Sequence, residues 1–455
     1  MKMKSYLWFI ATTLFILTGI SCEKIVEVPS SKSLVESKVV FGNAQLATAA
    51  LLGAYHTLGT VNTRMKYLSL YTDEYSYSSI TPGIVQFKNS TLLADNNDIS
   101  TLWRDFYSVI YQSNALMEGL QHSASIPSEE RNTLDAEGKF LRAFSYLYLV
   151  NLFDRVPLLL TTDVSKNRIE PQSHSKDIYM QIIKDLTEAK EMLSTTYQGT
   201  GKVRANKAAA TALLARVYLY QGKWNNAIIE SDQVIGSAIY LPLPELSNTF
   251  KANSKEAILQ LWVTNGFLSD ANTYIPSSGT VMPTYPITDL LYQAFTPEDQ
   301  RKIQWMGTNQ VTTSGITKPF RYPAKYKNRL ANASSPEYIM ALRLGEQYLI
   351  RAEAYAQLNQ TDQAIADINM IRVRAGLSPI IAHLLKDDCL TEIYRQRKLE
   401  LFGEWGHRFI DLKGSAQIDP VMEALKPTWK PTAKFLPIPV TEITYNKNLI
   451  QNENY

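Results

Sequence analysis

Hydrophobic residues recur at steps of three and four along most of this chain, the spacing that places them on one face of an α-helix. The segment that starts at Ser175 shows this clearly, because its apolar positions form one continuous stripe. Those positions are Ile178, Ile182, Leu186, Ala189 and Leu193. By the same criterion we predict helices over 44–58, 102–120, 128–151, 337–358, 361–375 and 387–402, with Ser128 as an N-cap.

Two segments, 214–234 and 351–371, share one spacing: a small residue is followed by tyrosine after three positions and by alanine after twelve. The matched pairs are Ala215 with Ala352, Tyr218 with Tyr355, and Ala227 with Ala364. This spacing is typical of tetratricopeptide helix pairs, in which alanines allow the helices to cross closely and tyrosine fills the groove beside them. Such a pair cannot bury its apolar face alone, so we expect the pairs to stack.

Residues 237–336 interrupt the helical pattern with many prolines and one strand-like run at 257–263. Long ordered loops in a compact protein are commonly functional, so we expect this segment to be a loop-rich, ligand-binding insert. The predicted fold is mainly α: a tetratricopeptide-like scaffold with a large irregular insert and few short strands. Its helical parts are 43–236 and 337–455, which we expect to pack as one unit.

The first 21 residues have the features of a cleaved signal. Lys2 and Lys4 precede an apolar run over 6–20, which is too short for a membrane span of ~20 residues. Small residues then lead to Cys22, although Gly19 stands where a lipoprotein signal commonly has leucine. We predict a signal peptide over 1–21, lipidation of Cys22 and an extended tether over 22–42; the alternative is plain secretion with an incidental cysteine. Two or more acyl chains would anchor the protein stably.

Composition excludes several function classes. The formal net charge is only +3, and two of these charges leave with the signal, so there is no electrostatic case for nucleic acid. The sequence contains none of the common hydrolase, phosphate-binding or paired-cysteine motifs, and we expect no catalytic residue, cofactor or metal. A zinc site around His383 and a calcium site at 95–98 lack the necessary ligand spacing. We expect Cys389 to be a packed helix residue.

Charged residues of the C-terminal helices admit two interpretations. They could include a carboxylate pair for glycoside hydrolysis, which needs two acids about 5–10 Å apart beside a cleft. We favour ion pairs between packed helices, because every acid has arginines nearby and arginine suits bidentate pairing. The residues concerned are Arg343, Glu346, Arg351, Glu353, Arg372, Arg374, Arg395, Arg397, Glu400, Glu404 and Arg408.

Aromatic residues make the positive case for binding. The chain has 26 tyrosines and 15 phenylalanines, and a ring with a polar edge suits a half-exposed surface that can stack on a sugar ring. Tyrosines gather near Asp73 and again within the insert. We assign Trp103, Trp224 and Trp262 to the core and take Trp305 as the foremost ligand platform. The other candidate ligand-binding residues are Asp73, Tyr75, Tyr77, Asn97, Tyr274, Tyr285 and Tyr322.

Several sequence strings together resemble the SusD/RagB family of outer-membrane nutrient-binding lipoproteins. They are LRLGEQYLIRAEAYAQLNQTDQAIADINMIRVRAGLSP at 342–379, EIYRQRKLELFGEWGHRFIDLK at 392–413, and a C-terminal end with LPIP, Glu442 and QNENY. The segments 107–114, 141–144, 156–158 and 177–193 are also similar. Departures are small: Phe153-Asp154 stands where the family often has Phe-Gly, and Gly414 where a basic residue is common.

The resemblance implies a protein of the outer membrane, held by lipid at Cys22 on the extracellular face. Such a protein partners a SusC-like TonB-dependent transporter, captures a nutrient fragment and delivers it without breaking a bond. A glycan fragment is the expected ligand. The alternatives are a family member that captures peptides and a lipid-anchored helical glycosidase.

Overall fold

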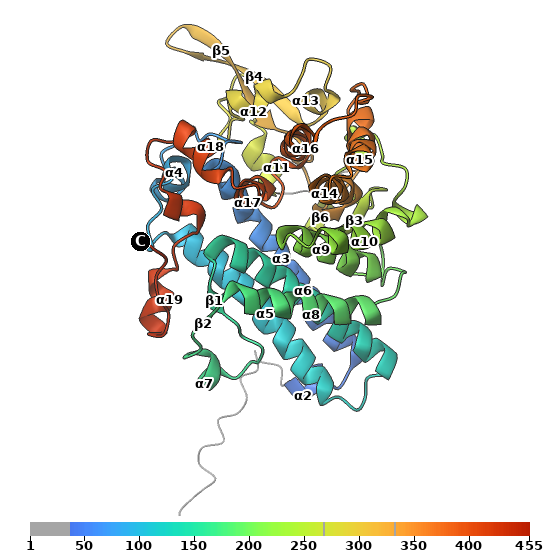
Figure 1. Ribbon diagram of the computed structural model, residues 1–455. Coiled ribbons are helices and arrows are strands. Elements are labelled where there is room, and N and C mark those ends of the chain that lie inside the picture. Colours follow the sequence, from blue (N-terminus) through green and yellow to red (C-terminus); the bar gives the residue numbers. More distant parts are fainter. Residues whose placement is uncertain (1–36, 267–268, 332–333) are drawn as a thin grey trace, which may run out of the picture.

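The structure is a computed structural model that describes residues 37–266, 269–331 and 334–455, so Cys22 and the predicted signal peptide lie outside the described residues. It is mainly helical, as predicted (Figure 1). Among the described helices, none has both the length and the apolar character required to cross a membrane. The long helices are α3 (Ala44–Tyr71), α5 (Asn97–Gln121), α6 (Ser128–Phe153), α8 (Ser175–Met192), α9 (Lys207–Tyr220), α10 (Trp224–Ile235), α14 (Leu344–Gln357), α15 (Thr361–Arg374) and α16 (Lys386–Leu401).

Shorter elements connect and flank these helices. The short α-helices are α2 (Ser37–Val40), α4 (Pro82–Asn89), α7 (Val164–Asn167), α11 (Ser269–Tyr274), α12 (Asp289–Ala294), α13 (Gln300–Gln304), α17 (His407–Gly414), α18 (Ile418–Leu425) and α19 (Val440–Tyr445). Four single 3-10 turns are η1 (Ala238–Tyr240), η2 (Leu246–Asn248), η3 (Thr264–Gly266) and η4 (Pro431–Lys434).

Local chemistry fixes the ends of the long helices. The Asn43 side chain accepts hydrogen bonds from the first backbone amides of α3, and Asn96 does the same for α5. At the other end of α3, the Lys426 ammonium donates to the carbonyls of Leu70 and Tyr71, which the helix itself leaves unpaired. The predicted cap of α6 was wrong: Ser128 is its first helical residue and Pro127 precedes it, without a side-chain cap.

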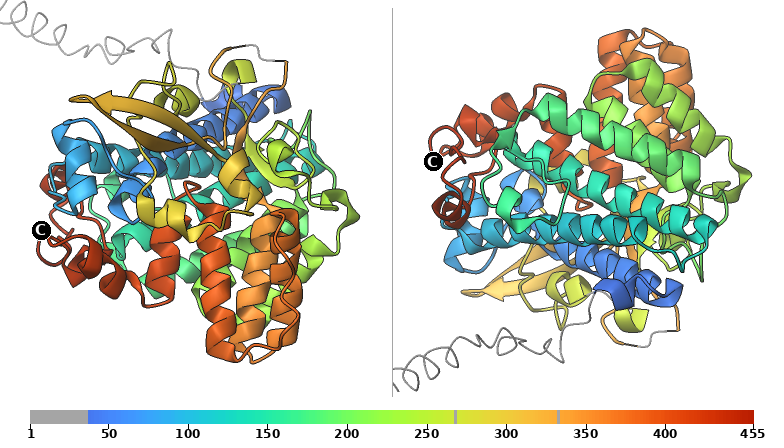
Figure 2. Two further views of the ribbon diagram at one scale, coloured as in Figure 1. Left: turned by 90° about the horizontal axis from the view of Figure 1, so that it is seen from above. Right: turned by 90° about the horizontal axis from the view of Figure 1, so that it is seen from below.

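The long helices pack in sequence order, each against the next, from α3 through α5, α6, α8, α9 and α10 to α14 and α15, with α16 against α14 (Figures 1 and 2). The predicted repeat corresponds to the pairs α9–α10 and α14–α15, which stack through α10 and α14. Ala215, Ala227, Ala352 and Ala364 are fully buried at these crossings. The tetratricopeptide-like arrangement is therefore confirmed.

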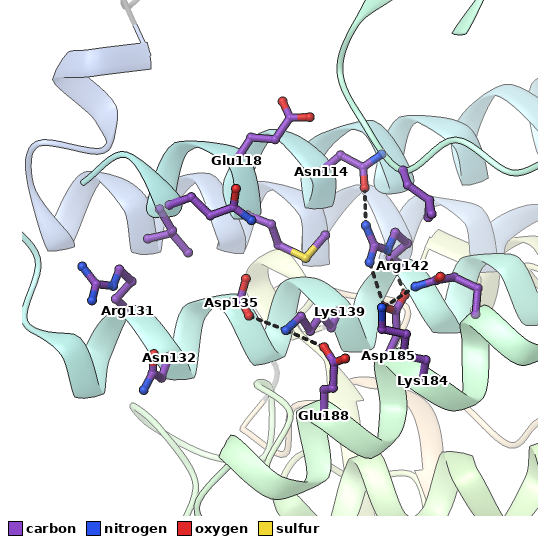
Figure 3. A pocket seen from close by; sticks show the side chains of 15 residues that line it. Asn114, Glu118, Arg131, Asn132, Asp135, Lys139, Arg142, Lys184, Asp185 and Glu188 are labelled. Carbon is purple, nitrogen blue, oxygen red and sulfur yellow. Dashed lines mark hydrogen bonds and ion pairs between the residues drawn. The ribbon is translucent and has the colours of Figure 1, made fainter. Parts of the chain in front are cut away.

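Ion pairs join α6 to α8, and a hydrogen bond joins α6 to α5 (Figure 3). Arg142 on α6 binds both carboxylate oxygens of Asp185 on α8, at 2.8 and 2.7 Å, and donates to the Asn114 side chain on α5. Lys139 lies 2.8 Å from both Asp135 and Glu188. These groups line a cavity of about 370 Å³, in which the charges of the buried side chains are already paired.

Three antiparallel strand pairs are present in the described residues: β1 (Val156–Pro157) with β2 (Gln172–Ser173), β3 (Ala257–Leu261) with β6 (Ile339–Arg343), and β4 (Met306–Thr313) with β5 (Ile316–Pro323). The predicted strand at 257–263 is confirmed as β3. The helix predicted from 337 is wrong over β6: this strand pairs with β3 and is buried on both faces, so its continuous apolar run mimics a buried helix.

The charged residues of the C-terminal helices form ion pairs, as predicted. Glu400 is fully buried and lies 2.7 Å from Arg343 and 3.2 Å from Arg301, and it also pairs with Arg374. Arg343 further pairs with Glu404 at 2.9 Å. Further pairs include Arg216–Glu346, Arg351–Asp367, Arg372–Glu392, Arg395–Glu392, Arg397–Asp411, Arg397–Glu353 and Arg408–Asp73.

Candidate functional site at the end of helix α3

Backbone pairing brings the two tyrosine-rich segments of the sequence together. The amides of Ser76 and Ser78 donate to the carbonyls of Pro286 and Thr284, at 2.7 and 3.1 Å. The amide of Ile287 in turn donates to the carbonyl of Arg321 in β5, at 2.8 Å. Residues 75–78 that follow α3 therefore lie beside 284–287, which lie beside the β4–β5 hairpin. In Figure 2, seen from above, this hairpin extends across α3.

This pairing brings together the rings of Tyr75, Tyr77, Tyr274 and Tyr285. The pair Tyr67 and Phe87, with ring centres 5.2 Å apart, lies beside them, since Lys66 is near both Tyr67 and Tyr285. We define these six residues as the aromatic cluster. Tyr274 lies at the centre, with its ring 5.9 Å from that of Tyr75 and 5.8 Å from that of Tyr285, both edge to face. Tyr77 lies 5.4 Å from Tyr285. Such edge and tilted contacts add to the stability gained by burying the rings. Four predicted site residues are therefore brought together.

The cluster is only partly open to solvent. Tyr75, Tyr77 and Tyr285 are buried against their neighbours, so they support the cluster rather than face a ligand. Tyr67 and Tyr274 are half-buried. We therefore expect direct contact with a ligand from Tyr67 and Tyr274 rather than from all four candidate tyrosines. Tyr67 was not among the candidate residues.

A cation lies beside the cluster. The Lys66 ammonium is 5.6 Å from the ring centre of Tyr67 and 5.8 Å from that of Tyr285, within cation–π range. Lys66, Asn62 and Tyr274 also line the mouth of a narrow cavity of about 30 Å³. Its walls include Lys325, where burial lowers the pKa to about 8 although Glu404 lies 2.6 Å away.

Asp73 lies at a second cavity, of about 410 Å³, on the other side of Tyr75. Its carboxylate is bound by Arg408 at 2.7 and 2.9 Å and by Lys398 at 2.8 Å. Burial opposes ionisation, but these two cations outweigh it and lower the pKa of Asp73 to about 2. Both carboxylate oxygens are thus engaged. The interpretation of Asp73 as a ligand contact is corrected: it fixes α17 and α16 to the end of α3.

Trp305 is also corrected. Its side chain is 1% exposed, and its indole nitrogen donates to the carbonyl of Leu246 at 3.1 Å. The ring packs edge to face on Phe250, with the Lys325 ammonium 4.7 Å from its centre. Neither face of the ring is open to a sugar. The polar residues beside Trp305 in the sequence suggested an exposed loop. In the structure Trp305 directly follows α13 and packs into the core.

The remaining two candidates lie outside the aromatic contacts. Tyr322 packs across the hairpin on Gly307, where a Cβ atom would lie 2.2 Å from its ring. Asn97 is exposed and is the first residue of α5, while its neighbour Asn96 caps that helix. Neither residue has a ring contact with the cluster.

Trp262 was assigned to the core and is 52% exposed, because it follows the last residue of β3 rather than facing inward from it. Trp103 is buried as predicted, and Trp224 is half-buried. A tryptophan immediately after a mostly apolar strand-like run was the available signal. Trp262 is the one exposed tryptophan within the described residues, and it precedes the segment that carries Tyr274.

The sequence matches two family profiles. One, described as starch-binding and associating with the outer membrane, covers residues 27–219; the other, the SusD family, covers residues 284–414. The chain is 26% identical to SusD-like protein P2 of Formosa agariphila in an alignment that covers 81% of this chain and 82% of the relative. It is also 26% identical to the starch-binding protein SusD of Bacteroides thetaiotaomicron, with 70% of this chain and 72% of the relative covered.

Solved structures share the fold. A SusD superfamily protein from Bacteroides vulgatus superimposes with a TM-score of 0.78 at 20% identity, covering 91% of this chain and 100% of the other. A laminarin-binding SusD-like protein gives 0.76 at 25% identity, covering 90% and 99%. Both profiles, the relatives and the helical architecture agree with the resemblance seen in the sequence. The chain belongs to the SusD/RagB family.

Proposed function

We propose that this protein is an outer-membrane lipoprotein that captures a glycan fragment and delivers it to a SusC-like TonB-dependent transporter. Lipid on Cys22 would hold it on the extracellular face, and no bond of the ligand is broken. The relatives named above for starch and laminarin support a carbohydrate as the ligand class. The capture step uses no catalytic residue, cofactor or metal.

The observation that carries this proposal is the aromatic cluster. Tyr67 and Tyr274 offer half-exposed rings on which the C–H face of a sugar can stack, as bases stack on aromatic platforms of other binding proteins. Lys66 and Asn62, at the mouth of the adjoining cavity, supply donors and an amide oxygen for sugar hydroxyls. Buried tyrosines beneath hold these groups in place.

Ion pairing argues against the glycosidase alternative. A hydrolytic acid needs a carboxyl group beside an open cleft, with a second about 5–10 Å away. Glu256, Glu400 and Glu404 are buried, and each pairs with arginine. Their carboxylates stabilise the packing of β6, α14 and α16. Glu404 lines the narrow cavity beside the cluster, but its carboxylate is held there by Arg343 and Lys325.

Calorimetric titration with a panel of neutral oligosaccharides and of short peptides tests the proposal. We expect heat of binding from at least one oligosaccharide, and about a tenfold weaker affinity in Tyr274→Ala, the effect of losing one stacked ring. Tyr355→Ala is the matched control, because Tyr355 is also a half-buried tyrosine but lies on α14. Binding of peptides alone would favour the peptide-capturing alternative, and release of reducing ends would show catalysis.

The membrane anchor needs a separate measurement. Mass spectrometry of the protein purified from its outer membrane should show an N-terminal Cys22 that carries acyl chains. An unmodified thiol at this position would contradict the anchor without affecting the binding site.

A further inference from the structure

A cavity of about 470 Å³ lies far from the aromatic cluster, between α5, the residues after α6, and the C-terminal segment that contains α19. In Figure 1, α7 and α19 lie at the lower left, whereas the β4–β5 hairpin is at the top. The volume of the cavity falls within the ~300–1,000 Å³ usual for small-molecule sites. We call it the α5 cavity. None of the residues named for the first site lines this cavity.

Two helices present aromatic side chains to the α5 cavity. Arg104, Tyr107 and Tyr111 share one face of α5, since they are spaced by three and four residues. On α19, Glu442 and Tyr445 are three residues apart and line the other wall. Tyr111 is 53% exposed and Tyr445 is 83% exposed, so both side chains are more open than the buried Tyr75, Tyr77 and Tyr285 of the first cluster.

Polar groups in this cavity are only partly engaged. Glu442 lies within hydrogen-bond reach of the Trp103 side chain, and its partial burial raises its pKa. The Tyr107 hydroxyl donates to the carbonyl of Pro157 at 2.8 Å. The exposed Arg168 guanidinium lines the rim and, among the described residues, has no hydrogen-bond or ion-pair partner. A carboxyl group, a guanidinium and two open rings therefore converge on one space.

The cavity is pre-formed. The Asn114 amide donates to the carbonyl of Leu159 at 3.0 Å, and Glu118 accepts from the backbone amide of Thr162 at 2.9 Å. The Asn446 amide donates to the carbonyl of Glu170 at 2.7 Å, which joins the C-terminal wall to the same segment. A site whose walls are already fixed loses little conformational entropy when it is filled.

From these contacts we infer that the α5 cavity is a second saccharide-binding site. Open tyrosine rings fit the C–H faces of a sugar, and the Glu442 carboxyl and Arg168 guanidinium fit its hydroxyls. The neighbouring cavity of about 370 Å³ in Figure 3 differs, because the charges of Arg142, Lys139 and their partners are already paired. That the second site binds a saccharide rests on the proposed function, whereas its position rests on the cavity and the residues that line it.

Hydroxyl-radical footprinting with mass spectrometry tests the inference on the processed full chain. The probes are laminarihexaose, maltohexaose and xylohexaose, and the readout is oxidation of Tyr111, Tyr445 and Tyr274. We expect one probe or more to protect Tyr111 and Tyr445, and this protection to persist in Tyr274→Ala. Affinity for the second site should fall roughly tenfold in Tyr445→Ala and little in Tyr445→Phe, which keeps the ring.

Each other outcome has a defined meaning. Calorimetric binding without protection of Tyr111 and Tyr445 overturns the second site and leaves the proposed function intact. Protection that disappears in Tyr274→Ala also overturns it, because the two sites would then be one. Binding of none of the probes, by either method, contradicts both. Protection of Tyr111 and Tyr445 without protection of Tyr274 supports the second site and contradicts the placement of the first.

Discussion

The hydroxyl oxygen of Tyr75 rests against the backbone of Gly403, where a Cβ atom would lie 1.9 Å from it. Gly403 has φ +70°, a conformation that other residues adopt only with strain. This contact joins the segment after α3 to the end of α16, beneath the aromatic cluster. The geometry of the candidate site therefore depends on a residue that carries no side chain.

Replacing Gly403 with alanine should lower the free energy of unfolding by about 2–4 kcal/mol, from backbone strain and overpacking together. Two controls separate these causes. Gly199 has φ +73°, and a Cβ atom added there would have no neighbour within 4 Å, so Gly199→Ala reports backbone strain alone. Gly414→Ala is helical with open space, so it should be neutral or stabilising. Chemical denaturation measures all three; equal losses at positions 403 and 199 would show that the Tyr75 contact is unimportant.

Removal of the Asp73 carboxylate should be strongly destabilising. Asp73→Ala leaves Arg408 and Lys398 without their buried counter-ion, and breaking such a pair typically costs about 3–5 kcal/mol. Asp289→Ala is the control, since its pair with Arg321 is at the surface, where such pairs contribute about 0–1 kcal/mol. Urea unfolding of both variants gives the comparison. A loss at position 73 no larger than at 289 would return Asp73 to the list of ligand contacts.

Glu74 should make stability depend on pH. Burial raises its pKa to about 7, and its neighbour Asp73 adds to the effect, although the Ser69 hydroxyl opposes it. Because the folded state holds this proton more tightly than the unfolded chain, its contribution is complete below about pH 4.5 and is lost as the pH rises through 7. The loss amounts to about 3 kcal/mol, at about 1.4 kcal/mol per pKa unit.

The variant Glu74→Gln removes this titration. We expect the wild-type protein to lose stability relative to the variant between pH 5 and pH 8, measured by urea unfolding at both values. The difference between the two proteins isolates Glu74 from other titrating groups such as Lys413 and Lys426. Parallel pH profiles of the two proteins would contradict the raised pKa.

Trp305 should affect stability and leave ligand affinity unchanged. Trp305→Ala removes a fully buried ring and should cost about 3–5 kcal/mol. Trp305→Phe keeps most of the volume but loses the hydrogen bond to Leu246, and should cost less. Affinity for the oligosaccharide that the wild type binds should be unchanged in Trp305→Phe. A tenfold weaker affinity in this folded variant would restore Trp305 as a ligand platform.

Sequence patterns predicted the helical architecture well, because periodicity and small-residue spacing report directly on helix faces. The stripe from Ile178 to Leu193 is buried throughout, and the alanines of the two repeat pairs lie at helix crossings. The β4–β5 hairpin was missed, although Ser314 and Gly315 at its turn both have positive φ, as a two-residue hairpin turn requires. Its strands were hidden within a segment whose prolines suggested loops.

Candidate site residues were harder to predict, because exposure depends on contacts between distant segments. Tyr75, Tyr77, Tyr274 and Tyr285 were named as candidates in two separate segments, and the sequence does not show that these segments meet or which rings cover which. The exposure of Trp305 and of Trp262 was predicted wrongly for the same reason. Burial of Trp305 depends on Leu246 and Phe250, which are about 60 residues away.

Residues 75–78 and 284–287 are held together by main-chain hydrogen bonds, which need an N–H donor on one side and only a carbonyl on the other, as Pro286 shows. The side chains above this frame can therefore be exchanged without disturbing it. Surface rings at this position can therefore differ between relatives while the supporting backbone stays the same, which fits a family whose members share a fold at about one-quarter identity or less.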